Sequence, residues 1–220
     1  MELASLITKF NSNFAEKSLA LCDDWLKSVD SLIAHNLNTL TCDDLQQMYF
    51  VFFENLKRWR SCSHGFTGFS EFLVFRALYN TIESRGEHFE PFNGRNTMTD
   101  PIIIKSQNYE IGQNVTTTRA GITLEKGYKI PDIYIKKAGK PISIIQIKVV
   151  LTGEQNQISN EARTFELLKE HNEDLKGLFI TFIPDGFTII KRKMLEEVGF
   201  KTIILKDNLE IITQVLNEVI

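Results

Sequence analysis

The side chains best able to do chemistry are an aspartate, a glutamine and a lysine placed around one predicted hairpin. The segment 128–151 contains two apolar, β-branched runs on either side of Gly139, a turn signal with its glycine where a positive φ is required. If Gly139 is the centre of the hairpin, Asp132 and Gln146 are cross-strand neighbours, give or take one residue. Their Cβ atoms would then lie about 5 Å apart.

Lys148 shares a strand face with Gln146, because side chains alternate between the two faces of a strand. The opposite face of the same strand is apolar and consists of Ile145, Ile147 and Val149. Polar groups inside such a strand cost a few kcal/mol unless they have partners. The sequence therefore predicts a polar site here, with Asp132 as the expected counter-ion of Lys148.

Pro131-Asp132, a hairpin, and then Gln146-Ile147-Lys148 resemble the PD-(D/E)xK signature of the restriction-endonuclease-like nucleases. The resemblance implies a metal-dependent, restriction-type endonuclease that hydrolyses phosphodiester bonds in DNA. Asp132 and Gln146 would be ligands of Mg²⁺ or Mn²⁺, and Lys148 would position the attacking water. Gln146 stands where the family usually has Asp or Glu, and Mrr-type restriction enzymes resemble this Gln-x-Lys version. A neutral amide binds a hard cation less strongly than a carboxylate, so a single metal ion is expected.

The same family often adds a glutamate from the helix before the sheet, and Glu71 is the residue that resembles it. Glu71 continues the apolar helical stripe of Phe75, Leu78 and Ile82, whereas Glu83 falls on a more polar side. Glu71 is therefore expected to be a catalytic residue and a third metal ligand. The alternative is a glutamate in the first turn that interacts with the helix dipole.

The order of predicted elements indicates an α/β fold in which crossover units build a mixed sheet covered on both faces. Helix, hairpin, helix and strand is also the order of the core in the resembled family. We therefore expect a restriction-endonuclease-like mixed β-sheet flanked by helices, with an N-terminal helical extension. The expected division is a helical region at 1–62 and a nuclease domain at 63–220.

The segment 90–121 is polar, and we expect it to be irregular apart from a strand at 102–104. Arg and Asn can form bidentate hydrogen bonds with guanine and adenine edges. A loop beside a catalytic hairpin could read bases in this way, and the candidates are Arg95, Asn96, Asn114 and Arg119. Ordinary surface loops have the same composition, which is the alternative interpretation.

The composition is that of a globular domain, with 220 residues, 43% hydrophobic and 24% charged, and a net charge of −3. Three cysteines without a CxxC pair, no basic N-terminal region and no long apolar run predict a cytoplasmic protein without membrane contact. Glycine-rich phosphate loops, zinc-ligand spacings and the GxSxG elbow are absent. DNA is the expected partner, and a homodimer is left open.

Two alternatives to an active nuclease remain. The first is a catalytically silent member of the same fold that binds nucleic acid or regulates another protein. The second is a protein-interaction module that uses the N-terminal helices. Metal binding that is lost on Asp132→Ala would separate an active site from both. DNA affinity with a steep salt dependence would separate the silent binder from the interaction module.

Overall fold

A mixed β-sheet of six strands forms the centre of the part of the chain that the computed structural model describes, which comprises residues 66–90, 101–150, 155–183, 189–204 and 210–220. The strands lie in sequence order across the sheet. The pairs β1–β2, β2–β3 and β3–β4 are antiparallel, whereas the pairs β4–β5 and β5–β6 are parallel. The bounds are β1 Ile102–Lys105, β2 Tyr109–Gln113, β3 Ile133–Lys137, β4 Lys140–Val150, β5 Lys176–Ile183 and β6 Phe200–Ile204.

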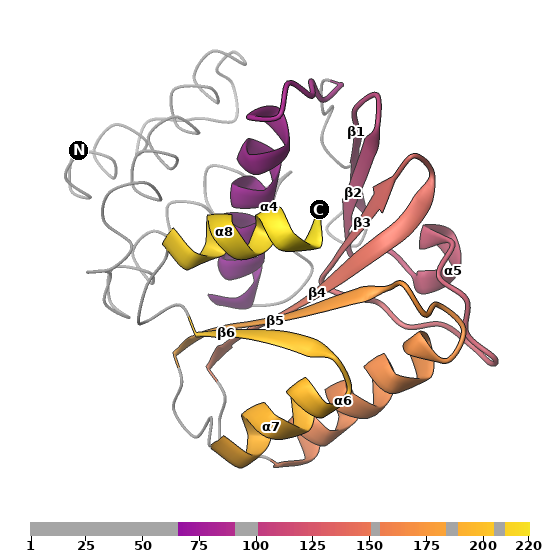
Figure 1. Cartoon of the computed structure of the whole chain (residues 1–220), viewed down its shortest axis with the longest axis vertical. Coiled ribbons are helices and arrows are strands. Elements are labelled where there is room, and N and C mark those ends of the chain that lie inside the picture. Colours follow the sequence, from indigo (N-terminus) through magenta and orange to yellow (C-terminus); the bar gives the residue numbers. More distant parts are fainter. Residues whose placement is uncertain (1–65, 91–100, 151–154, 184–188, 205–209) are drawn as a thin grey trace.

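Helices cover both faces of this sheet (Figure 1). The two parallel crossovers run through α6 (Gln155–Lys169) and α7 (Ile189–Glu197), which pack against each other on one face. Because both crossovers step in the same direction and such connections are right-handed, their helices share a face. The other face carries α4 (Phe66–Glu83) and α8 (Glu210–Val219). The α/β mixed sheet flanked by helices is therefore confirmed.

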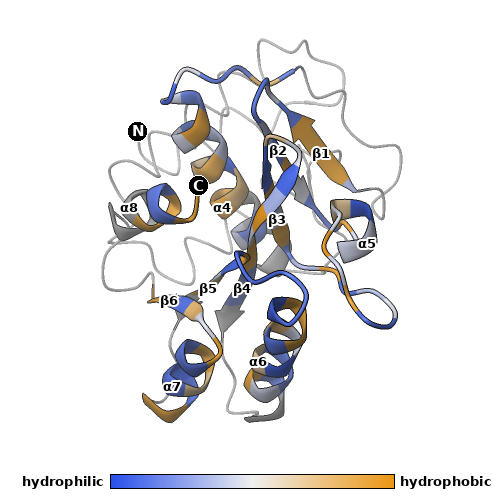
Figure 2. Cartoon of the chain, turned by 45° about the vertical axis from the view of Figure 1, so that its right-hand side comes forward, coloured by the Kyte–Doolittle hydropathy of each residue, from blue (hydrophilic) through white to orange (hydrophobic). Residues whose placement is uncertain are grey.

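A short helix, α5 (Thr117–Ala120), lies between β2 and β3. The segment that follows it extends away from the sheet before β3 and is largely hydrophilic (Figure 2). The described helices include none that is long and apolar enough to cross a membrane.

The β3–β4 turn consists of Ala138 and Gly139, which both have positive φ angles, 50° and 79°. Lys137 pairs directly with Lys140 across this turn. Alanine rarely adopts a positive φ, but the N–H of Ala138 donates a hydrogen bond to the carbonyl of Asn108 at 2.7 Å. The contact with the neighbouring turn thus helps to hold the strained residue.

A β-bulge next to this turn restores the register expected from a hairpin centred on Gly139. The two-residue turn is centred between positions 138 and 139, which alone would shift the pairing by one residue. The register changes beyond Ile135, which pairs with Ser143, and Ile133 pairs with Ile145. Because a slip of one residue would turn every side chain of β4 to the opposite face, the bulge decides where Gln146 and Lys148 point.

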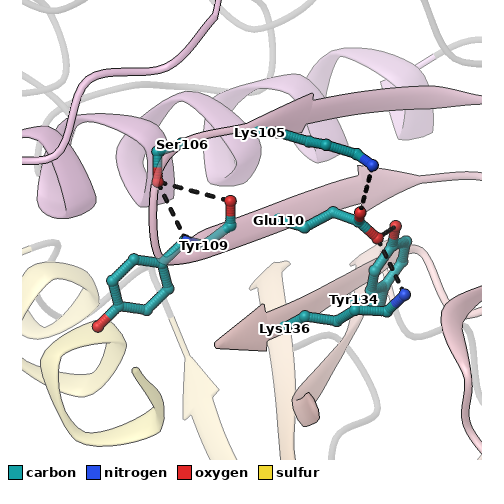
Figure 3. A network of polar contacts seen from close by, with 6 residues as sticks. All are labelled: Lys105, Ser106, Tyr109, Glu110, Tyr134 and Lys136. Atoms are coloured by element: carbon teal, nitrogen blue, oxygen red, sulfur yellow. Dashed lines mark hydrogen bonds and ion pairs between the residues drawn. The ribbon is translucent and has the colours of Figure 1, made fainter. Parts of the chain in front are cut away.

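The predicted irregularity of segment 90–121 is wrong for β2 and α5. Glu110, the second residue of β2, hides the strand pattern, since a carboxylate would be costly on a buried sheet surface. Figure 3 shows what engages it: Glu110 lies 3.1 Å from Lys105 and 3.1 Å from Lys136, and it accepts a 2.5 Å hydrogen bond from the Tyr134 hydroxyl. These partners lie on the two neighbouring strands, so the pattern of β2 alone cannot reveal them.

Most other elements agree with the sequence-based expectations to within a few residues. α4 ends at Glu83 and its chain turns at Gly86, which has a φ of 85°. The strand expected at 102–104 is β1. The predicted helical region 1–62 lies outside the described residues, so this domain division stays a prediction.

The core beneath α6 contains closely packed aromatic rings. The ring centroids of Phe165 and Phe200 lie 4.1 Å apart, and Phe179 meets Phe200 edge-on at 6.1 Å. Gly177 lies beneath them: a Cβ at this position would be 2.4 Å from Cζ of Phe165 and 2.7 Å from Cδ1 of Phe200. A glycine is therefore required where β5 passes under the rings.

Gly177→Ala is expected to lower the free energy of unfolding by about 1–3 kcal/mol, because the added methyl overpacks a buried cluster. Urea denaturation measures this change. Phe165→Leu removes the ring atoms that the methyl would meet, so the double variant should lose less stability than the sum of the two single variants. Additive losses would contradict this account.

Candidate functional site

Asp132 is fixed against β4 at the point where β3 begins. Its Oδ2 accepts a hydrogen bond from the backbone N–H of Ile147 at 2.6 Å. Continuing the pairing of Ile133 with Ile145 by one step places Asp132 opposite Gln146. Asp132 and Gln146 are therefore cross-strand neighbours, as the hairpin predicts.

The side chains of Gln146 and Lys148 lie on the face of β4 that α6 covers. Ile144, two residues before Gln146, belongs to the aromatic core beneath α6. Gln146 is buried, and its strand neighbour on β5 is Phe179. The amide of Gln146 is thus enclosed in an otherwise apolar part of the sheet. Burying an amide is costly unless it has a polar partner, so this position favours a specific polar role for Gln146.

Lys148 forms its ion pair with Glu161 of α6, and the Nζ–Oε1 distance is 3.0 Å. The ion-pair contact is thus with Glu161 and not with Asp132, the expected counter-ion, because the lysine side chain reaches toward the helix that covers its face. Asp132 still interacts electrostatically with it: burial lowers the pKa of Lys148, but the charges of Asp132 and Glu161 outweigh burial and raise it. Lys148 is therefore a charged ammonium at neutral pH.

Glu71 approaches the same place from α4, on the opposite face of the sheet. It is almost fully buried, and its Oε2 accepts a hydrogen bond from Nε2 of Gln113 at 2.6 Å. Glu71 is the sixth residue of α4, so the alternative of a first-turn glutamate at the helix dipole does not apply. Glu83 instead accepts a hydrogen bond from the Tyr79 hydroxyl at 2.5 Å, away from the site.

The electrostatic environment of Asp132 opposes its ionisation. Burial, followed by the charge of Glu71, raises the pKa of Asp132 to about 7. Lys148 and the Ile147 N–H act in the other direction, and Glu161 adds a further increase. Among the residues that the structure describes, negative charge is therefore in excess around Asp132, even though Lys148 is present.

Glu161 and Gln113 complete the polar contacts of the site, and neither is predicted from the sequence. Glu161 lies three residues after Ile158 and four before Phe165, both of which are buried. A glutamate within a core-facing stripe is the same signal that identifies Glu71, so periodicity could have found it. Gln113 ends a strand that the sequence pattern does not reveal.

Two of the four base-reading candidates, Asn114 and Arg119, lie among the described residues. Arg95 and Asn96 lie outside the described residues. Asn114 is half-buried, and its side-chain nitrogen is shielded from solvent without a hydrogen-bond partner. Arg119 is exposed on α5. A role in base recognition stays a prediction for each of them.

The fit of a divalent cation depends on Glu71, Asp132 and the amide oxygen of Gln146. Within the described ranges, no group of three or more His, Cys, Asp or Glu side chains is arranged to hold a metal ion. A site made only of carboxylates is thus absent there, and Glu161 is already paired with Lys148. Burial and the charge of Glu71, which raise the pKa of Asp132, would also be relieved by a cation. Two carboxylates and one amide, of Glu71, Asp132 and Gln146, are the oxygen donors that would hold a single ion there.

Comparison with known proteins leaves the family open. The chain matches no model of a known protein family, and no curated protein sequence is similar enough to match it.

We expect the contribution of Asp132 to stability to fall as the pH rises from about 4 to about 7, because burial and Glu71 raise its pKa from 3.8 to about 7 on folding. The folded protein binds this proton more tightly than the unfolded chain, so this contribution is greatest below the lower value. Asp132→Asn keeps an oxygen for the Ile147 N–H and removes the charge. Its free energy of unfolding should exceed that of the wild type at pH 8, by up to about 4 kcal/mol, and the gain should shrink toward pH 4.

Denaturation with urea at several pH values, without divalent metal, measures this difference. Equal pH dependence in the wild type and Asp132→Asn would show that the carboxyl group is not destabilised by its surroundings.

Proposed function

We propose that this protein is a metal-dependent DNA endonuclease with a restriction-endonuclease-like fold. The observation that supports this most is the fixed position of Asp132, held by the Ile147 N–H beside Gln146 and near Lys148. The chain order of α4, the β3–β4 hairpin, α6 and β5 is the order of the common core in that fold. The additional carboxylate of Glu71, on the helix before the sheet, agrees with the same family.

Asp132, Glu71 and the amide oxygen of Gln146 would hold the Mg²⁺ or Mn²⁺ ion. When bound, such an ion lowers the pKa of a coordinated water and neutralises charge on the scissile phosphate. The protein contributes the fixed orientation of these oxygens, since Asp132 is tied to β4 and Glu71 is tied to Gln113. Preorganised groups need no rearrangement at the moment of reaction.

Lys148 acts as a hydrogen-bond donor and a positive charge in this proposal. Its pKa is raised, so it holds its proton at neutral pH and is poorly suited to remove one from water. It instead orients the attacking water and stabilises negative charge on the phosphate. Glu161 positions the ammonium by its 3.0 Å ion pair.

A catalytically silent nucleic-acid-binding protein of the same fold is the second candidate. It is favoured by the ion pair between Lys148 and Glu161, which partly balances the site without a metal ion. The lack of a three-carboxylate metal site among the described residues also favours it. The two candidates differ in whether DNA is cleaved.

We expect the wild type to cut DNA in the presence of Mg²⁺ or Mn²⁺ and to lose this activity in EDTA. Plasmid, branched and single-stranded DNA should be tested side by side, with Asp132→Asn as the inactive control. Binding of DNA without cleavage of any substrate would contradict the nuclease proposal and favour the silent protein.

Lys148→Met keeps most of the packing of the lysine stem and removes its charge. If the protein is a nuclease, this change should reduce the cleavage rate by about 100-fold or more, because a transition-state donor is lost. Binding of Mn²⁺, measured by calorimetry, should persist because Lys148 is not a metal ligand.

Lys136→Met is the matched control. Lys136 is also a partly buried strand lysine, and it forms a 3.1 Å ion pair with Glu110 outside the site. The control variant should cleave DNA at the wild-type rate. A Lys148→Met protein that cleaves at the same rate as Lys136→Met would refute the catalytic role of Lys148.

A further inference from the structure

Two large apolar side chains are exposed immediately before Asp132. Tyr128 and Ile130 keep 61% and 51% of their surface accessible. They are separated by Lys129, which is also exposed, and Pro131 beyond them is buried. The residues 128–130, called the 128–130 ridge below, therefore lead directly into the candidate site.

The 128–130 ridge is held in place by α5. The backbone N–H of Lys129 donates to Oγ1 of Thr117 at 3.0 Å, and its carbonyl accepts from the Thr117 N–H at 2.8 Å. Thr117 is fully buried, and α5 has an N-cap of its own at Thr116. Because its backbone makes two hydrogen bonds to a buried residue, the 128–130 ridge has a fixed position on the surface.

The charges around the 128–130 ridge favour a polyanion. Lys129 lies within the ridge, and the exposed cations Arg119 and Lys126 precede it in the chain, whereas residues 119–131 carry one acidic residue, Glu125. This local excess of positive charge occurs in a chain whose net charge is −3. Aromatic side chains among cations are typical of surfaces that bind single-stranded nucleic acid, where bases stack on rings and cations follow the backbone.

The apolar surface of Tyr128 and Ile130 is large enough to stack on a nucleic-acid base but too small for a stable interface with another protein. A stable protein–protein interface covers about 800 Å² on each partner, which two side chains cannot supply. One ring is enough to stack one base. The four Cα-to-Cα steps from Tyr128 to Asp132 span at most about 14 Å, or about four base-pair rises of 3.4 Å.

We propose that the 128–130 ridge binds a nucleic-acid strand with unpaired bases, and that Tyr128 stacks on a base a few nucleotides from the phosphate at Asp132. The inference rests on the proposed function and names the substrate class of that site. The faces of paired bases inside a duplex are covered by their neighbours, so Tyr128 can stack only where a base is unpaired. Single-stranded, gapped or frayed DNA is therefore the substrate class.

Fluorescence anisotropy of the full chain in EDTA tests this without cleavage. The probes are a labelled single-stranded DNA of about 20 nucleotides, longer than the ~4–16 nucleotides that a single-strand-binding module covers, and the blunt duplex of the same sequence. Tyr128→Ala should weaken binding of the single strand by about 5-fold or more, with a much smaller effect on the duplex. Tyr128→Trp keeps a ring and should retain the wild-type affinity for the single strand.

Ile190→Ala is the matched control, because Ile190 is 68% exposed on α7 and lies outside the 128–130 ridge. It should leave the affinity for both probes unchanged. The proposal is overturned if Tyr128→Ala binds the single strand as tightly as the wild type, if it weakens both probes equally, or if the wild type does not bind the single strand. The nuclease proposal is judged separately, by the Mg²⁺-dependent cleavage that Asp132→Asn should abolish.

Discussion

The hydrogen bond from the Ile147 N–H to the Asp132 carboxylate is the interaction on which the candidate site depends. It ties the start of β3 to the middle of β4, and it holds a charged group where burial opposes ionisation. The turn at Ala138 and Gly139 and the bulge beyond it must both be present for this bond to form. A shift of one residue in β4 would replace Gln146 and Lys148 by apolar side chains.

Two helical layers supply the other charged groups. Glu71 comes from α4 on one face of the sheet and Glu161 from α6 on the other. Among the described residues, three carboxylates, of Glu71, Asp132 and Glu161, thus interact with one ammonium, that of Lys148. The raised pKa of Asp132 reflects burial first and this imbalance of charge second, and either a proton or a cation can relieve it. Metal binding at this site therefore depends on whether a metal cation or a proton compensates the charge of Asp132.

The cluster of Glu110 with Lys105, Lys136 and Tyr134 has more positive than negative charge, unlike the surroundings of Asp132. Burial raises the pKa of Glu110, but the Tyr134 hydroxyl and the ammonium groups of Lys136 and Lys105 outweigh burial and lower it. One carboxylate with two lysines and a hydroxyl is satisfied within the protein, which is typical of a structural ion network. Asp132 remains under-compensated by its own neighbours, and such groups are more common at functional sites.

The sequence by itself determined the α/β class, the hairpin, the pairing of Asp132 with Gln146 and the direction of Glu71. Each follows from a local period: alternation along a strand, the 3.6-residue repeat of a helix, or a glycine turn. Only the tertiary structure decided that Lys148 pairs with Glu161, that Glu110 belongs to a strand, and that a bulge corrects the register of the turn. A period shows which face of its own element a residue occupies. It does not show which side chain of another element lies opposite, because that depends on how the elements pack.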